Sequence, residues 1–294
     1  MRRVFSSLFC LLALLQSVSV WAAAERIVTL APSWSHTVAE MGGIDNLVGV
    51  TRYARFPEAV PARVRSGELT VVGGFTDIKL EKILAQNPDL VLTASPLQLE
   101  LKAKLDAKGI DTLHMQERSV DDIYAKFLAL GERMGKQDQA KALVDKLKSD
   151  IASISETYQQ GKRPKVYYEL NYYYKCVPGA DSYIRELIEL AGGEPLFAER
   201  PGNAPAVTWE EVVAANPDVI LIPIWPGAQP AVFEGPRAGN GTTTIEEVMG
   251  RKDADKVAAV QHGGVRFIDS AVTKQPSPGL AKAVQLFAEA IHGQ

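Results

Sequence analysis

The chain has 294 residues, of which 46% are hydrophobic and 23% charged, and a net charge of −3. This length allows one large domain or two of ordinary size, and the composition is typical of a globular protein and excludes a disordered chain. The mild acidic excess gives no reason for binding nucleic acid, so we expect no nucleic-acid partner.

The first 24 residues predict a cleaved secretory signal peptide. Arg2 and Arg3 precede the apolar run VFSSLFCLLALLQSVSV, and the alanines at 22–24 supply a small-residue cleavage site. A membrane anchor is the alternative, but the run is short for a spanning helix, which needs about 20 apolar residues. We therefore expect cleavage near Ala24 and an exported, periplasmic protein.

The cysteines exclude disulfides within the mature protein. Cys10 lies in the expected signal peptide, and Phe9 before it fits a lipoprotein cleavage site poorly. Cys176 is then left without a cysteine partner, so no internal disulfide or cysteine metal cluster is possible. We expect Cys176 to act as a small buried hydrophobic residue, with metal ligation as the alternative.

Strands and helices alternate in the first part of the mature chain. Apolar runs predict strands at 27–30, 46–50, 69–74, 89–93 and 110–115, with helices from near His36 to Gly42 and at 77–87 and 99–109. Ser33 or Ser35 is expected to cap the helix near His36. Strands apolar nearly end to end, alternating with helices, indicate a parallel sheet covered on both faces.

The pattern changes between Ser119 and about Gln159, where no strand is predicted. Apolar side chains recur there every three or four residues, at Leu143, Leu147, Ile151, Ile154 and Tyr158. A helix from Asp138 to Tyr158 would be about 32 Å long. Its length and central place favour a connector over one more covering helix.

The alternation resumes after this helix. Strands are predicted at 165–170, 218–224 and 265–269, with helices at 181–193, 208–216, 243–250 and 278–293. The Gly- and Pro-rich stretch 226–241 is typical of a surface loop.

One short sequence occurs twice. LAQNPDLVLT at 84–93 is nearly repeated as AANPDVILIP at 214–223, so that Asn87 is matched by Asn216, 129 residues later. This spacing is too long for a solenoid, whose period is about 20–50 residues. We expect one supersecondary unit, used once in each of two similar lobes.

No enzyme motif is present. The sequence lacks a nucleophile elbow, a zinc-protease helix and a phosphate loop, and the histidines at 36, 114, 262 and 292 are scattered singly. We expect no catalytic residues, no metal site and no cofactor. An exported enzyme on a doubly wound fold remains the alternative, and turnover by the purified protein would decide for it.

Aromatic residues follow several predicted strands. Tyr172, Tyr173 and Tyr174 follow the strand at 165–170, Trp225 follows that at 218–224, and Trp34 follows that at 27–30. Arg52 and Tyr53 follow the strand at 46–50. Parallel sheets bind ligands at the carboxyl ends of their strands, so these side chains predict a flat, apolar binding surface, with core packing as the alternative for each.

Three stretches resemble a known family. They are RIVTLAPSWSHTVAEMGGIDNLVGVTRYARFPEAV, VVGGFTDIKLEKILAQNPDLVLT and YIRELIELAGGEPLF, and the chain is similar over nearly its whole mature length to periplasmic substrate-binding proteins of metal-chelate importers. These proteins serve ATP-driven transporters for cobalamin, ferric siderophores and haem. The resemblance implies two doubly wound α/β lobes joined by one long α-helix, with a ligand cleft between the lobes. The expected boundaries are a signal peptide at 1–24, lobes at 25–136 and 161–294, and a linker helix at 137–160.

The resemblance also implies a ligand and a set of contacts. We expect a corrinoid such as cobalamin, bound by Trp34, Arg52, Tyr53, Gly74, Phe75, Tyr172, Tyr173, Tyr174 and Trp225. A ferric siderophore held by Arg52, Arg55 and Arg200, or haem held by one of the tyrosines at 172–174, is the alternative. The continuous linker helix implies limited movement of the lobes.

In this family a glutamate on each lobe docks onto arginines of the membrane permease. Glu81 and Glu210 occupy that place and are related by the same 129-residue offset. The expected partner is therefore the permease of an ABC importer, and the protein is expected to act as a monomer. An exported sensor lobe, which would bind ligand without stimulating a transporter, is the remaining alternative.

Overall fold

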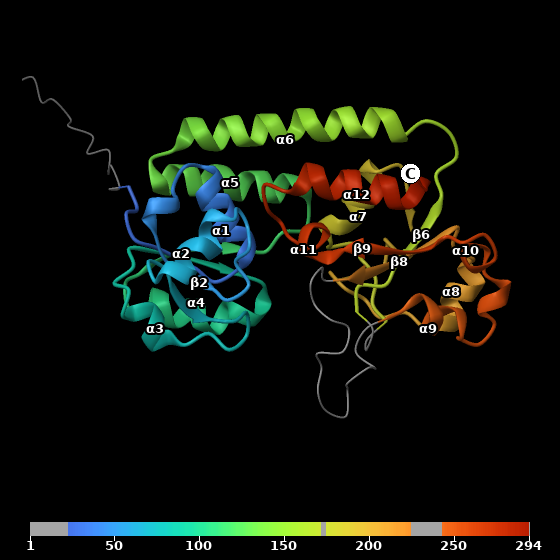
Figure 1. Ribbon diagram of the computed structural model, residues 1–294, viewed down its shortest axis with the longest axis horizontal. Coiled ribbons are helices and arrows are strands. Elements are labelled where there is room, and N and C mark those ends of the chain that lie inside the picture. Colours follow the sequence, from blue (N-terminus) through green and yellow to red (C-terminus); the bar gives the residue numbers. More distant parts are fainter. Residues whose placement is uncertain (1–22, 172–174, 225–242, 294) are drawn as a thin grey trace, which may run out of the picture.

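The computed structural model describes residues 23–171, 175–224 and 243–293. The chain forms two α/β lobes, and the long helix α6 (Gln137–Tyr158) runs across both of them (Figure 1). Helix α6 packs on α5 (Val120–Met134) at one end and on α7 (Tyr183–Leu190) and α12 (Leu280–His292) at the other. The predicted fold class is confirmed. Helix α6 begins at Gln137, the first residue of the expected linker and one residue before the helix expected from Asp138.

The N-terminal lobe contains a five-stranded parallel sheet. Its strand order is β3-β2-β1-β4-β5, from β1 (Ile27–Thr29), β2 (Leu47–Thr51), β3 (Thr70–Gly73), β4 (Leu90–Ala94) and β5 (Asp111–Met115). The lobe's helices are α1 (Pro32–Glu40), α2 (Ala59–Ser66), α3 (Leu80–Leu84) and α4 (Leu99–Asp106). Short 3₁₀ turns span Ile44–Asn46 and Pro96–Gln98.

The C-terminal lobe contains a four-stranded parallel sheet. Its order is β7-β6-β8-β9, from β6 (Lys165–Tyr168), β7 (Glu194–Pro195), β8 (Val219–Ile224) and β9 (Val265–Asp269). Besides α7 and α12, the described helices are α8 (Trp209–Ala215), α9 (Ile245–Met249), α10 (Ala258–Gln261) and α11 (Ser270–Thr273), with a 3₁₀ turn at Ala254–Lys256. The order β7-β6-β8-β9 matches β2-β1-β4-β5 strand for strand, so the lobes share one topology.

The repeated Asn-Pro-Asp performs the same local task in each lobe. Asp89 accepts the amide hydrogens of Glu25 and Arg26 just before β1, at 2.9–3.1 Å. Asp218 likewise accepts the amide hydrogen of Lys165, at the start of β6, at 2.8 Å. Asn87 and Asn216 adopt positive φ angles of 45° and 51°, a region that Asn tolerates better than most residues. The repeat therefore turns the chain out of a helix and fixes the start of the central strand of each sheet.

Helix α6 buries one side and exposes the other. The buried residues are Ala140, Val144, Leu147, Ile151 and Ser155, and the predicted Leu143, Ile154 and Tyr158 flank this line half-buried. The Ser155 hydroxyl donates to the Leu190 carbonyl at 2.7 Å, which ties α6 to the end of α7. On its exposed side, Lys–Asp ion pairs four residues apart support the helix.

Two local predictions are wrong. No serine side chain caps α1, because Ala31 is the N-cap residue and Pro32 begins the helix. The Ser35 hydroxyl instead bonds the Thr29 hydroxyl at 2.8 Å. Helix α3 is also shorter than 77–87, because Asp77 is engaged by Arg52 and the Gly74 amide and Lys79 is extended.

The hydrophobic core is continuous from one lobe to the other. One cluster of buried side chains includes Trp34 from the first lobe, Phe127 from α5, and Tyr168 and Phe287 from the second lobe. The rings of Tyr168 and Phe287 meet edge to face at 5.5 Å. Within the described ranges, no helix is both long and apolar enough to cross a membrane.

Candidate functional site

The carboxyl ends of strands from both sheets meet at the lobe boundary. A small pocket there is lined by Ser33 after β1, Tyr53 and Arg55 after β2, and Ala271 and Gln275 after β9. Its volume is about 20 Å³, which has room for about one water molecule. The pocket itself is too small to hold a chelate. Its lining comes from both lobes, so the strand ends of the two lobes lie next to each other here.

The N-terminal side of this boundary is ordered by an arginine–carboxylate pair. Arg52 donates two hydrogen bonds to Asp77, at 3.0 and 2.6 Å, and the Gly74 amide donates to the same carboxylate at 2.8 Å. The hydrogen bonds from Arg52 lower the pKa of Asp77 below its ordinary value. The Arg52 guanidinium also lies 5.7 Å from the centre of the Tyr53 ring, whose residue is 41% exposed. The structure thus brings Arg52, Tyr53 and Gly74 together.

Gly74 allows Arg52 and Asp77 to lie close to the backbone. A Cβ atom at this position would lie 2.3 Å from both Arg52 Nη1 and Asp77 Oδ1. Phe75 is half-buried and packs against the main core, and its carbonyl accepts a hydrogen bond from Gln98 at 3.0 Å. Phe75 is therefore mainly a packing residue at the lobe boundary and offers only part of its ring to a ligand.

The prediction that Trp34 faces the ligand is wrong. Trp34 is fully buried, and its indole N–H donates to the Thr93 carbonyl at 2.8 Å. Helix α1 starts directly after β1, so its first turn packs into the core of the lobe. His36 and Phe56 lie at the boundary instead, with ring centres 5.8 Å apart, and burial lowers the pKa of His36 to about 4.

Tyr172, Tyr173, Tyr174 and Trp225 lie outside the described residues, so their predicted role stays a prediction. The residues beside the tyrosines are described. Asn171 pairs with Cys176 in an antiparallel bridge, and Cys176 pairs in the same way with Ala206. Cys176 is buried in the core, where burial raises the pKa of its thiol, in agreement with its expected hydrophobic role.

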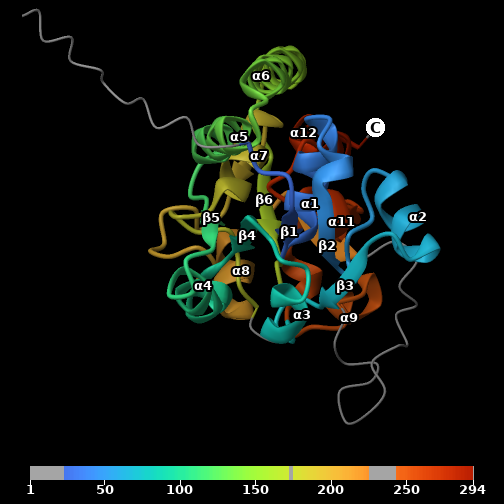
Figure 2. The ribbon, with the colours of Figure 1, turned by 90° about the vertical axis from the view of Figure 1, so that its left-hand side faces the viewer.

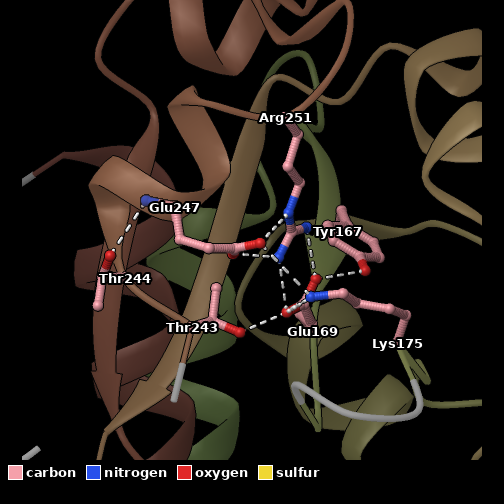
Figure 3. A network of polar contacts seen from close by, with 7 residues as sticks. All are labelled: Tyr167, Glu169, Lys175, Thr243, Thr244, Glu247 and Arg251. Atoms are coloured by element: carbon pink, nitrogen blue, oxygen red, sulfur yellow. Dashed lines mark hydrogen bonds and ion pairs between the residues drawn. The ribbon is translucent and has the colours of Figure 1, made fainter. Parts of the chain in front are cut away.

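A polar network that the sequence analysis missed lies at the carboxyl end of β6 (Figure 3). The Glu169 carboxylate is 1% exposed and receives hydrogen bonds from Tyr167 Oη at 2.9 Å and from the Thr243 hydroxyl. Arg251 donates to both of its oxygens, at 2.7 and 3.0 Å, and Lys175 Nζ lies 3.3 Å away. Burial opposes ionisation here, but the bonds from Arg251 keep the pKa of Glu169 below its ordinary value.

The network extends to two helices of the same lobe. Arg251 binds Glu247 of α9 at 2.5 and 3.0 Å, and its guanidinium lies 4.8 Å from the centre of the Trp209 ring. Trp209 is the first residue of α8, and its indole N–H donates to the Lys252 carbonyl at 2.8 Å. A sequence signal for this network did exist, because an acid directly after the apolar strand VYY requires a buried partner.

Glu81 and Glu210 occupy equivalent positions in the two lobes. Each is the second residue of its helix, α3 and α8 respectively, and each is exposed. Figures 1 and 2 both place α3 and α8 on the side of the molecule away from α6. Glu211 differs from Glu210, because it accepts the Thr208 amide hydrogen at 2.8 Å and pairs with Arg200.

Comparison with known proteins decides the family. A family model described as a periplasmic binding protein matches residues 27–272. The chain belongs to the periplasmic binding protein family. This periplasmic binding protein is 26% identical over 275 residues to the cobalamin-binding protein of Halobacterium salinarum, covering 91% of this chain and 69% of that one.

Solved structures share the fold of this periplasmic binding protein. The periplasmic vitamin B12 binding protein of Vibrio cholerae superposes with a TM-score of 0.72 at 22% identity, covering 92% of this chain and 97% of that one. A periplasmic heme-binding protein from Roseiflexus sp. RS-1 superposes with a TM-score of 0.70 at 21% identity, covering 92% of this chain and all of that one. These likenesses confirm the two-lobed fold with its connecting helix.

Membership of this family confirms a binding protein and not an enzyme. In the part of the chain that the structure describes, no group of three or more His, Cys, Asp and Glu side chains is placed to hold a metal ion. The described strand ends present aromatic rings, hydrogen-bonding groups and paired charges.

Proposed function

We propose that this periplasmic binding protein captures a corrinoid such as cobalamin and delivers it to an ABC importer. The observation that carries the proposal is that two of the three arginines expected to bind an anionic chelate, Arg52 and Arg200, are already paired with carboxylates. Arg52 is held by Asp77, and Arg200 donates to the Glu211 carboxylate and to the Ala206 carbonyl. An arginine that keeps its carboxylate partner offers little net charge to a second anion.

On the C-terminal side of the boundary, the charges of the basic side chains are likewise balanced by carboxylates. Glu169 and Glu247 face Arg251 and Lys175, which gives two carboxylates against two basic groups. Such a network beside the boundary suits a ligand without strong net charge, because Arg251 and Lys175 each already face a carboxylate. The cobalamin-binding name of the Halobacterium relative supports the same ligand class.

Haem or a ferric siderophore is the alternative ligand. The specific observation in favour of haem is the fold that the chain shares with the heme-binding protein from Roseiflexus. Haem carries two carboxylates, and Arg52 or Arg200 would have to leave its present partner to bind one of them.

A titration of purified mature protein with cobalamin, cobinamide, haem and ferric siderophores tests the ligand. We expect saturable one-to-one heat exchange with cobalamin or cobinamide in a calorimeter. We also expect the affinity to change little with salt, because few unpaired charges take part. Tight haem binding that weakens steeply with salt, with no corrinoid binding, would overturn the assignment.

We propose further that Glu81 and Glu210 are the contacts to the importer's permease. Two exposed carboxylates at equivalent positions on one side of the molecule give a symmetric pattern that basic groups on a membrane partner can recognise. The proposal includes export with cleavage near Ala24 and action as a monomer. Intact mass and light scattering of the protein recovered from the periplasm test these two points.

A further inference from the structure

The residues just before α8 and a segment that follows β6 are joined through the backbone. Lys175 accepts the Val207 amide hydrogen at 3.0 Å, and Cys176 pairs with Ala206. Thr208 then caps α8, and Glu210 follows two residues later. Residues 175–176, which follow the predicted ligand-binding tyrosines, therefore pair with residues 206–207, only a few residues before the proposed docking carboxylate of Glu210.

The same two regions are also joined through one side chain. Arg251 is 8% exposed at its side chain and binds both oxygens of Glu169, directly after β6 (Figure 3). Its guanidinium also lies over the Trp209 ring, at the start of α8. A guanidinium can bind in its plane and stack on its face at once, which an ammonium group cannot do. Arg251 is therefore suited to fix β6 and α8 relative to each other.

We infer that Arg251 is a positioning residue that holds the ligand-side end of β6 and the docking turn of α8 in one arrangement. Its consequence for docking rests on the proposed function. The N-terminal lobe has a weaker counterpart, because Arg52 joins the end of β2 to the segment before α3 through Asp77, but that pair is exposed. The more rigid link is therefore the one in the C-terminal lobe.

A purely structural role for Arg251 would be to neutralise buried Glu169. The two roles separate in the double variant Glu169→Gln with Arg251→Met. This variant removes one carboxylate and one guanidinium, and the remaining Lys175 and Glu247, 3.8 Å apart, compensate each other. If Arg251 only neutralises Glu169, this variant recovers both stability and docking. If Arg251 positions α8, the variant recovers stability but not docking, since the link to Trp209 is gone.

The experiment measures three quantities on the full mature protein. They are the melting temperature, the hydrogen exchange of amides in residues 207–216, and the protein concentration that half-maximally stimulates the importer ATPase at saturating ligand. The matched control is Asp111→Asn with Arg133→Met, which removes a half-buried ion pair of the other lobe. Arg251→Lys is the second test variant, because it keeps the charge and loses the planar fork.

We expect the double variant to melt near the wild-type temperature while exchange at 207–216 rises about tenfold. We expect the half-maximal concentration to rise about tenfold as well. Arg251→Lys should change both in the same direction by less, and the control variant should change neither.

Wild-type exchange and ATPase stimulation in the double variant would overturn the inference, and so would an equal effect of the control. If the double variant does not fold, Arg251→Lys alone decides between these outcomes. Failure of the proposed function is distinguishable, because wild-type protein would then stimulate no importer while the exchange measurement still reports on the link.

Discussion

At the lobe boundary, the ion pair between Arg52 and Asp77 depends on the absence of a side chain at Gly74. Gly74 leaves no space for a side chain, because an added Cβ would approach both Arg52 and Asp77 to 2.3 Å. A side chain at this position would disturb the ion pair more than the backbone, since Arg52 Nη1 and Asp77 Oδ1 are the ends of flexible side chains that can move.

We predict that Gly74→Ala separates Arg52 from Asp77 and weakens ligand binding about five- to tenfold, with little change in melting temperature. Calorimetric titration measures the affinity. Asp77→Ala breaks the same pair, so the two substitutions together should weaken binding no more than either alone. Additive losses would contradict the assignment.

His36 predicts a pH dependence of stability. Burial lowers the pKa of His36 to about 4 in the folded protein, whereas an exposed histidine titrates near 6.5. The unfolded chain therefore binds a proton first, and the contribution of neutral His36 is complete above about pH 6.5 and is lost as the pH falls toward 4.

We expect His36→Gln to remove this part of the pH dependence, which amounts to up to about 3 kcal/mol between pH 7 and pH 4. Urea denaturation of both proteins at several pH values measures it. Identical pH profiles for wild type and variant would show that His36 is not held neutral by burial.

At the scale of helices and strands, much of the fold was predictable from apolar periodicity. Fully buried strands such as β4 and β8 and the long helix α6 carry strong local patterns. Strand β7 has only two residues and α2 buries only Val60, so neither gives a pattern to detect.

The site was less predictable, for physical reasons that two residues illustrate. Trp34 follows a strand, but the helix starts so soon after β1 that the indole is turned into the core. Glu169 and Arg251 are 82 residues apart, and their pairing depends on where the fold brings the residues that follow α9 relative to the end of β6. Order along the chain does not encode either outcome.

The helices α3 and α8 carry the docking prediction. We expect Glu81→Lys with Glu210→Lys to abolish stimulation of the importer ATPase while ligand affinity stays unchanged, because both carboxylates are exposed and on the side away from α6. Each single reversal should raise the half-maximal concentration about tenfold.

Glu156→Lys is the matched control for docking, since it makes the same charge change on the exposed side of α6. It should leave stimulation intact. Unaffected stimulation in the Glu81/Glu210 variant would refute the docking role, and a wild-type protein that binds ligand but stimulates no importer would favour a sensor.

At the scale of the whole molecule, α6 and the continuous core limit how far the lobes separate. The helix is packed at both ends, and the Trp34 to Phe287 cluster crosses the boundary. No flexible loop hinge interrupts α6, so we expect ligand binding to change the distance between the lobes by no more than about a few ångströms. Spin-label distances between exposed positions on α4 and α10, with and without ligand, measure this change, and a large closure would contradict it.

We expect one ligand to bind between the strand ends of both lobes. Hydrogen exchange of the mature protein with and without saturating cobalamin tests this arrangement. We expect protection on both sides of the boundary at once, at residues 52–56 of the first lobe and 169–171 and 270–277 of the second. Protection confined to one lobe, or located on the exposed side of α6, would show that the ligand binds elsewhere.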